Sequence, residues 1–339
     1  MTNRDQAVQA FLDSTHWAGA ETAPLAGDAS NRRYLRLHRQ GESAVLMDAP
    51  TEKGEDVQPF MRVAGYLAGI GLSAPRILAA DEAGGFLILE DLGDALYARV
   101  LQREPALEET LYTAATDLLV HAHRSEPLPD LADYAPGFMA DMAALAFDWY
   151  LKALTGGDQA ARRRFHGAMH HALEIHAPQA DVLIQRDYHA ENLLWLPERQ
   201  GIARVGLLDF QDARRGHRAY DLVSLLQDAR RDVPPDLETR MIRHYIAAAS
   251  QGAEEFTTAY HVLGAQRNLR IIGVFARLCL TSGKAHYIDL IPRVWAYLQR
   301  DLAHPALKEV ADTLQGILPS PGPEVLSKLK AQCASPPNP

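Results

Sequence analysis

The stretch that most constrains the fold lies between residues 183 and 211. An apolar run ends there in a polar loop that carries Asp187 and, later in the same loop, Asn192. Two short apolar segments then flank a turn-like sequence at 197–201, which is typical of a β-hairpin. Pairing of the two segments would bring Asp209, at the end of the second, back beside Asn192. The stretch therefore predicts a cluster of oxygen-bearing side chains, two of them suited to Mg²⁺.

The pattern D-x-x-x-x-N, followed by a strand that ends in Asp-Phe, has the order of residues used in kinase-type phosphoryl transfer. Each half alone is equally compatible with loop capping, because Asp and Asn are common loop residues. The spacing, the hairpin and the order together favour the kinase interpretation. In that interpretation Asp187 is the catalytic residue, and Asn192 and Asp209 hold Mg²⁺ against the phosphates of ATP.

The composition is that of a soluble globular protein. The chain has 339 residues, 47% of them hydrophobic, which is enough for two lobes with cores of their own. A formal net charge of -9, without a long Lys/Arg stripe, argues against a nucleic-acid partner. Two cysteines are too few for a disulfide framework, and we see neither an apolar signal core nor a membrane-length run. We therefore expect a cytoplasmic protein, monomeric and without a membrane partner.

Residues 1–92 are expected to form a small, β-rich, nucleotide-binding lobe, which opens with an amphipathic helix at 4–16, where apolar residues stand at helical spacing. A polar break at 27–31 separates two expected strands and predicts a flap over the ATP phosphates. Taken alone, the break is more typical of an ordinary hairpin turn, but its position ahead of Asp187 favours the flap. The next strand, expected at 44–47, has Met47 where a kinase usually carries a phosphate-pairing Lys.

Several cations could replace that Lys. Arg32, Arg33 or Lys53 could supply the charge, or Mg²⁺ could carry more of it. Strands expected at 75–80 and 86–90 lead into a segment that would form the hinge facing adenine, although a strand leaving a sheet fits equally well. The predicted nucleotide-binding residues are Gly27, Ser30, Asn31, Arg32, Arg33, Glu90 and Leu92.

Residues 93–334 are expected to form a larger, mostly helical lobe, followed by a disordered tail at 335–339. The apolar periodicity predicts helices at 107–123, 138–154, 160–177, 234–249, 254–281 and 290–302. Residues 212–218 are expected to form a short charged loop. Asp221, at the start of another helix, is either buried against the backbone N–H groups of the catalytic loop or a simple helix-terminal charge.

Only about ten residues separate Asp209 from that helix, so the activation loop of a protein kinase is absent. The acceptor is therefore expected to be a small molecule. Over about residues 20–300 the order of segments resembles the aminoglycoside phosphotransferase/choline kinase superfamily. Four stretches resemble its branch of bacterial cell-wall amino-sugar kinases: LAGDASNRRY at 25–34, VLMDAP at 45–50, RDYHAENL at 186–193 and QRN at 266–268.

The resemblance implies an α+β, two-lobed, protein-kinase-like fold. It also implies transfer of phosphate from ATP, with Mg²⁺, to the anomeric hydroxyl of N-acetylmuramic acid and N-acetylglucosamine in peptidoglycan recycling. Gln185 stands where the superfamily usually has His, and Gln211 where protein kinases have Gly. The competing hypotheses are a kinase for an aminoglycoside, choline, homoserine or fructosamine, and a pseudokinase that binds nucleotide without transfer.

An N-acetylmuramate acceptor carries a lactyl carboxylate, for which an Arg fork is the best partner. Arg214, Arg215, Arg267 and Arg270 are candidates for that role, although surface solvation would explain each of them singly. His189, Glu191 and Asp212 lie near enough in sequence to the catalytic groups to touch sugar hydroxyls.

Overall fold

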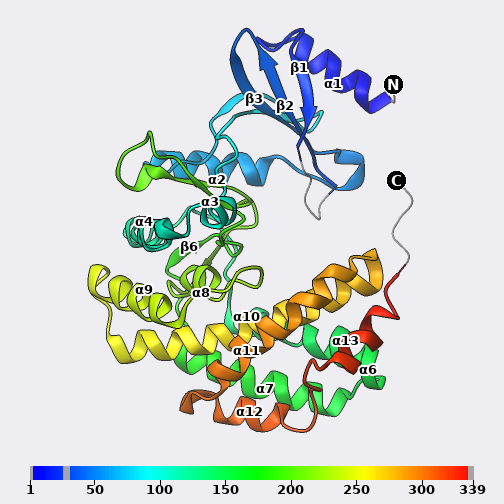
Figure 1. Cartoon of the computed structure of the whole chain (residues 1–339), viewed down its shortest axis with the longest axis vertical. Helices are drawn as coiled ribbons and strands as arrows, with labels where there is room; N and C mark the ends of the chain where they lie inside the picture. The colour runs from blue at the N-terminus through cyan, green and yellow to red at the C-terminus, as the bar shows by residue number, and fades with distance from the viewer. Residues whose placement is uncertain (1–2, 26–30, 335–339) are drawn as a thin grey trace. The chain divides into compact units, whose positions relative to one another are not determined.

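The computed structural model describes residues 3–25 and 31–334 (Figure 1). The predicted flap residues Gly27 and Ser30, and the predicted tail 335–339, lie outside the described residues. The chain folds into two compact units, Met1–Leu118 with Glu191–Ala213, and Leu119–Ala190 with Arg214–Pro339. This division does not test the lobe boundary predicted near residue 92, which stays a prediction.

The first unit contains a five-stranded antiparallel sheet with the order β1-β2-β3-β5-β4. Its strands are β1 (Glu21–Pro24), β2 (Arg33–Arg39), β3 (Glu42–Asp48), β4 (Ile77–Asp81) and β5 (Phe86–Glu90). Gln40 and Gly41 join β2 to β3 with φ angles of 50° and 85°. Two successive positive φ angles are typical of a tight hairpin turn, which explains a glycine at this point.

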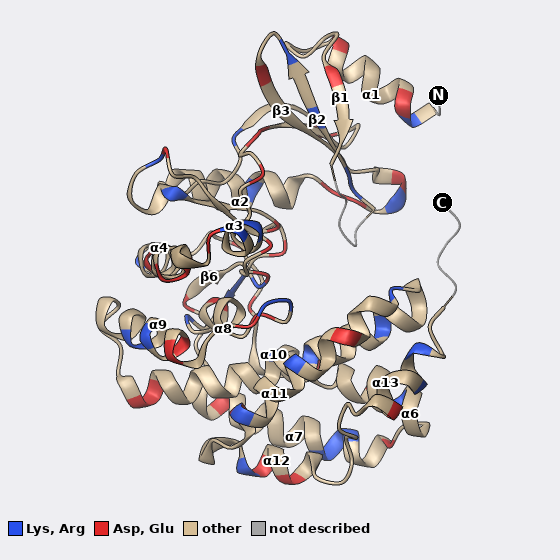
Figure 2. Cartoon of the chain, in the orientation of Figure 1, with Lys and Arg blue, Asp and Glu red and all other residues tan. Residues whose placement is uncertain are grey.

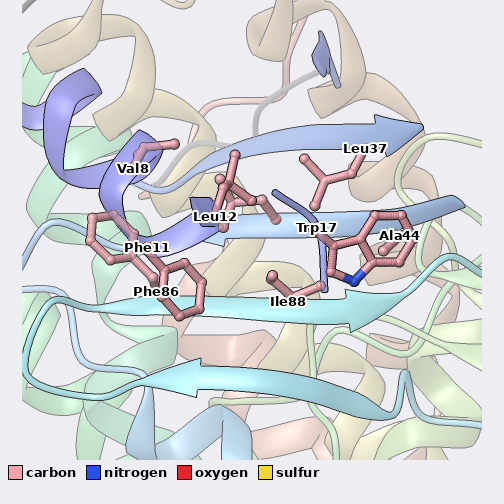
Figure 3. Close-up of a cluster of buried hydrophobic side chains, with 9 residues drawn as sticks. Val8, Phe11, Leu12, Trp17, Leu37, Ala44, Phe86 and Ile88 are labelled. Carbon is pink, nitrogen blue, oxygen red and sulfur yellow. The ribbon is translucent and has the colours of Figure 1, made fainter. Parts of the chain in front are cut away.

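Helix α1 (Asn3–Asp13) packs on this sheet. Its apolar residues Val8, Phe11 and Leu12 point into a buried cluster that also contains Phe86 and Ile88 of β5 (Figure 3). The rings of Phe11 and Phe86 stack with their centroids 5.5 Å apart. The helical spacing of these residues is the feature that predicted the helix, and burial against the sheet stabilises it.

The remainder of the first unit carries the predicted hairpin. Helix α2 (Gln58–Gly69) follows β3, α3 (Tyr97–Arg103) follows β5, and α4 (Glu108–Ala122) begins in this unit. The predicted hairpin is confirmed: β7 (Leu193–Trp195) pairs with β8 (Val205–Leu207) in antiparallel register. Helix α3 was not predicted.

The second unit is mostly helical and is built around α10 (Ala253–Ser282), a helix of 30 residues. Around it lie α5 (Pro136–Ala143), α6 (Lys152–Thr155), α7 (Gln159–His176), α8 (Tyr220–Leu226), α9 (Pro235–Ala248), α11 (Ile291–Leu302), α12 (Lys308–Leu314) and α13 (Pro323–Lys330). Figure 1 shows α10 and α11 side by side, in agreement with their contacts. The small sheet and the many helices confirm the predicted α+β class.

The helix predicted at 138–154 is interrupted. It begins as α5, is followed by a π-helical segment at Ala146–Leu151, and then continues as α6. Gly273 of α10 approaches the interruption so closely that a Cβ there would lie 2.3 Å from the backbone carbon of Leu145. The break therefore accompanies close packing of two backbones, a tertiary contact that a local pattern does not encode.

The prediction of a loop at 212–218 was wrong for the middle of that segment. Residues Arg214–Gly216 form a strand, β9, which pairs antiparallel with β6 (Val182–Ile184). A Cβ at Gly216 would lie 2.5 Å from the side chain of Ile184, so the pairing requires a residue without a side chain. This short sheet fixes the backbone that leads into Asp187.

One disulfide links Cys279, near the end of α10, to Cys333, which follows α13. A single bridge ties the end of the chain to the central helix, and it is not the framework typical of disulfide-rich domains. Within residues 3–25 and 31–334, no helix is both long enough and apolar enough to cross a bilayer.

Candidate active site

The loop after β6 carries the predicted catalytic residue, and the buried carboxylate of Asp221 fixes the backbone in front of it. Asp221 is 0% exposed and accepts hydrogen bonds from the backbone N–H groups of Gln185 at 2.6 Å and Arg186 at 2.9 Å. This is the first of the two alternatives that the sequence left open. Burial raises the pKa of Asp221 to about 7, although the two backbone N–H groups act in the opposite direction.

Helix α10 also holds this loop, through a backbone carbonyl group of the loop. Arg267 is 3% exposed and donates hydrogen bonds to Ser224 Oγ at 2.8 Å and to the Gln227 carbonyl at 3.4 Å. Ser224 Oγ in turn donates to the Arg186 carbonyl at 3.3 Å. Asp187 therefore follows a residue whose N–H and C=O are both bound to the protein core.

Ser224 and Gln227 were missed at the sequence level. The signal that could have found them is the polar triplet Gln266-Arg267-Asn268, which is buried in the middle of a largely apolar helix. Each member makes a specific bond: Gln266 donates to the Met139 carbonyl at 2.8 Å, and Asn268 donates to Gln227 Oε1 at 2.7 Å. Polar groups in such a place must be satisfied by partners from neighbouring elements.

Asp187 is half-buried, and the charges of three arginines, Arg270, Arg267 and Arg186, act on it. Burial acts to raise the pKa of Asp187. The charges of Arg270, His189, Arg267 and Arg186 lower it by more than burial raises it, so the pKa lies below its ordinary value. The group is therefore a carboxylate at neutral pH. Burial also lowers the pKa of His189 to about 4, so this side chain is a neutral imidazole at neutral pH.

Aromatic rings and arginines form a wall in the same unit. Arg270 Nη1 donates to Tyr220 Oη at 3.4 Å, and the Tyr220 ring meets the Tyr134 ring at 5.0 Å in an edge-on contact. The guanidinium of Arg186 lies over the Tyr134 ring at 5.5 Å. Arg214 lies over the neighbouring Phe138 ring at 4.3 Å. Such a wall offers apolar faces together with positive charge.

The two predicted metal ligands lie together in the first unit. Asn192 Nδ2 is 3.5 Å from Asp209 Oδ2, and the Leu208 N–H donates to the Asn192 carbonyl at 3.0 Å. Asp209 has a φ of 58°, and Gln211 Nε2 donates to its other carboxylate oxygen at 2.6 Å. The hairpin thus brings an amide and a carboxylate to one place, as predicted.

This pair has the oxygen donors that Mg²⁺ prefers. Among the described residues no three His, Cys, Asp or Glu side chains gather into a metal site. Two protein ligands fit Mg²⁺ that is completed by phosphate oxygens and water, which is the usual arrangement at nucleotide sites. Phe210, next to Asp209, is buried and stacks on Phe60 of α2 with the ring centroids 4.9 Å apart.

The candidate nucleotide-binding cations differ in their partners. Arg32 Nε donates to Glu55 at 2.8 Å, and the Asn31 N–H donates to the same carboxylate at 3.1 Å. Arg33 instead donates to the buried Asp48 at 3.0 Å. Lys53, the third candidate, lies in a short 3₁₀ helix (Thr51–Lys53) and is exposed.

The predicted hinge residues are tied to the β7–β8 hairpin. Glu90 accepts a hydrogen bond from Arg199 Nη2 at 2.9 Å. Leu92 lies against Gly206 of β8, where a Cβ would come within 3.3 Å of the leucine side chain. The remaining candidates for sugar contacts, Glu191 and Asp212, are exposed.

Comparison with known proteins identifies the family of this chain. Residues 21–257 match the model of the phosphotransferase enzyme family. An N-acetylmuramate/N-acetylglucosamine kinase of Caulobacter vibrioides is 40% identical and covers 91% of this chain and 95% of its own length. A Pseudomonas aeruginosa protein of the same name is 36% identical, with coverages of 88% and 89%.

The crystal structure of choline kinase LicA from Streptococcus pneumoniae is similar in fold, with a TM-score of 0.63 at 12% identity. It covers 92% of this chain and 100% of its own. The similarity confirms the predicted fold. Since the family model matches well over half of the sequence, this chain belongs to the phosphotransferase enzyme family.

Proposed function

We propose that this protein transfers the γ-phosphate of ATP to the anomeric 1-hydroxyl of N-acetylmuramic acid and N-acetylglucosamine, as a step in cell-wall recycling. The observation that carries the choice of acceptor is the set of arginines around Asp187. An aminoglycoside or choline is cationic and would need an acidic or aromatic pocket, whereas these arginines favour a neutral or anionic sugar. The names of the two bacterial relatives support the same choice.

In the proposed reaction, Asp187 orients the sugar 1-hydroxyl and accepts its proton. The hydroxyl oxygen forms a bond to the γ-phosphorus, the bond from that phosphorus to the β,γ-bridging oxygen breaks, and ADP leaves. An anomeric hydroxyl is more acidic than an ordinary alcohol, so a carboxylate with a lowered pKa suffices. Positioning by Asp221 and Arg267 then contributes as much as basicity does.

Asn192 and Asp209 would hold Mg²⁺, which neutralises charge on the phosphates. We propose that Arg32, which pairs with Glu55, supplies the cation that the third strand lacks, because Arg33 is held by two carboxylates, Asp5 and Asp48. Asn31, Gly27 and Ser30 would cover the phosphates.

We further propose a cytoplasmic monomer without a nucleic-acid partner. Figure 2 shows basic and acidic residues on the same helices, for example α9 and α12, rather than gathered by sign. This distribution does not favour a polyanionic partner.

The test is a phosphate-transfer assay with ATP and Mg²⁺ on a panel of acceptors. The panel contains both amino sugars, an aminoglycoside, choline, homoserine and a fructosamine. We expect turnover with the two amino sugars and a new phosphate at the anomeric carbon. Turnover with a cationic acceptor alone would refute the proposal, and nucleotide binding without transfer to any acceptor would favour a pseudokinase.

A further inference from the structure

We propose that Arg270 receives the carboxylate of an acidic acceptor sugar and thereby sets the preference between N-acetylmuramate and N-acetylglucosamine. The inference rests on the proposed function, and it names one residue for a substrate group that only the first of the two sugars carries. It starts from a difference between two arginines that lie one turn apart on α10.

Arg267 and Arg270 lie on the same side of α10, because residues three apart on a helix are neighbours. Two donors of Arg267, Nη2 and Nη1, are engaged within the protein by Ser224 and by the Gln227 carbonyl. Its guanidinium is also buried, so it is suited to positioning the catalytic loop rather than to binding a ligand.

Arg270 is only half-buried. In the part of the chain that the structure describes, its side chain makes one hydrogen bond, a long one of 3.4 Å to Tyr220 Oη. A guanidinium has five N–H donors, so most of those on Arg270 remain available to a ligand. Tyr220 does not neutralise this charge, because burial raises the pKa of its phenol above the ordinary value.

The site lies beside the reacting group. Tyr220 directly precedes Asp221, which binds the backbone in front of Asp187. Arg270 is also the cation that contributes most to lowering the pKa of Asp187. Arg267 also faces Asp221 and Asp228, whereas Asp187 is the carboxylate whose charge acts on Arg270, so Arg270 is the cation suited to a second carboxylate.

The other candidate arginines have partners of their own. Arg215 forms an ion pair with Asp133, with Nε 2.7 Å from Oδ1. Arg214 covers the Phe138 ring and donates to the Asp133 carbonyl at 3.3 Å. Of the four arginines considered at the sequence level, Arg270 is therefore the best placed to form a two-pronged contact with a carboxylate.

The test compares wild type with Arg270→Gln and Arg270→Lys, and measures kcat and KM for both sugars. Arg277→Gln is the matched control, because Arg277 is an exposed arginine on the same helix. Loss of a charge-assisted fork should lower kcat/KM for N-acetylmuramate about 10- to 100-fold relative to N-acetylglucosamine, mainly through KM. Arg270→Lys should restore part of this ratio, since it keeps the charge but loses the fork.

The ratio separates the proposed role from other effects. Removing Arg270 also raises the pKa of Asp187, but that change affects both sugars equally and cancels in the ratio. Equal losses for both sugars, or no loss for either, would overturn the assignment of Arg270 and leave the proposed function intact. If wild-type protein phosphorylates neither sugar, the proposed function fails and the assignment fails with it.

Discussion

Removal of the Asp221 carboxylate tests the positioning of the catalytic loop most sharply. The carboxylate is 0% exposed and is the acceptor for two backbone N–H groups, at 2.6 and 2.9 Å. In Asp221→Ala both groups lose this partner inside the protein. Each unsatisfied buried donor costs about 1–3 kcal/mol, so the expected loss of stability is about 2–6 kcal/mol.

This loss should be visible as a fall in Tm. A unit of this size shifts by about 2–4 °C per kcal/mol, so we expect a decrease of at least about 4 °C. Arg186 has a φ of 73°, a conformation that is costly for a residue with a side chain. Without Asp221 this strain can relax and displace Asp187, so turnover should fall even where the protein remains folded.

The assay combines thermal unfolding with steady-state kinetics well below Tm. Asp221→Asn should be intermediate, since one amide oxygen can replace one of the two acceptors. Asp312→Ala is the matched control, because Asp312 is an exposed carboxylate paired with Lys308 on α12, and a surface pair of this kind contributes about 0–1 kcal/mol. If Asp221→Ala keeps normal turnover and a Tm within about 2 °C of wild type, then Asp221 does not position the catalytic loop.

Three further predictions follow from the site. Asp187→Asn should lower kcat about 10²–10⁴-fold with little change in ATP affinity, as measured by kinetics and nucleotide titration; near-normal turnover would exclude the role. Asp209→Ala should raise the Mg²⁺ concentration needed for half-maximal rate, and an unchanged magnesium dependence would contradict metal binding. The pKa of Asp221 is raised to about 7, so its contribution to stability is present at low pH and is lost as pH rises through 7. The Tm advantage of wild type over Asp221→Asn should therefore shrink as pH rises from about 4, near the pKa of an unfolded Asp, to about 7, and then level off; an advantage that grows over this range would contradict the shift.

The sequence predicted those features that depend on local spacing. The Asn192–Asp209 pair could be found because a hairpin with a short turn determines which residues meet. Helix α1 could be found because its apolar residues repeat at helical spacing and have a sheet to cover. In both cases the local pattern and the final packing agree.

Features that depend on contacts distant in sequence were missed. Strand β9 is three residues long, two of them Arg, and it exists because β6 offers a partner. The π-helical segment lies where Gly273 approaches closely from a helix far along the chain. A pattern read over a window of neighbouring residues contains neither contact.

The roles of the arginines were left open for the same reason. Arg32 and Arg33 are adjacent residues of the same type, yet Arg32 pairs with Glu55 and Arg33 pairs with Asp48. Arg267 and Arg270 lie one turn apart, yet only the first is fully buried. The choice of partner depends on which neighbouring element carries the carboxylate or hydroxyl.

The most direct test of the proposed function is the position of the transferred phosphate. Wild-type protein would be incubated with ATP, Mg²⁺ and N-acetylglucosamine or N-acetylmuramate, and the product examined by phosphorus NMR. We expect a phosphate on the anomeric oxygen of each sugar, coupled to the anomeric proton. Phosphate on another hydroxyl, or no phosphorylated sugar with either acceptor, would contradict it.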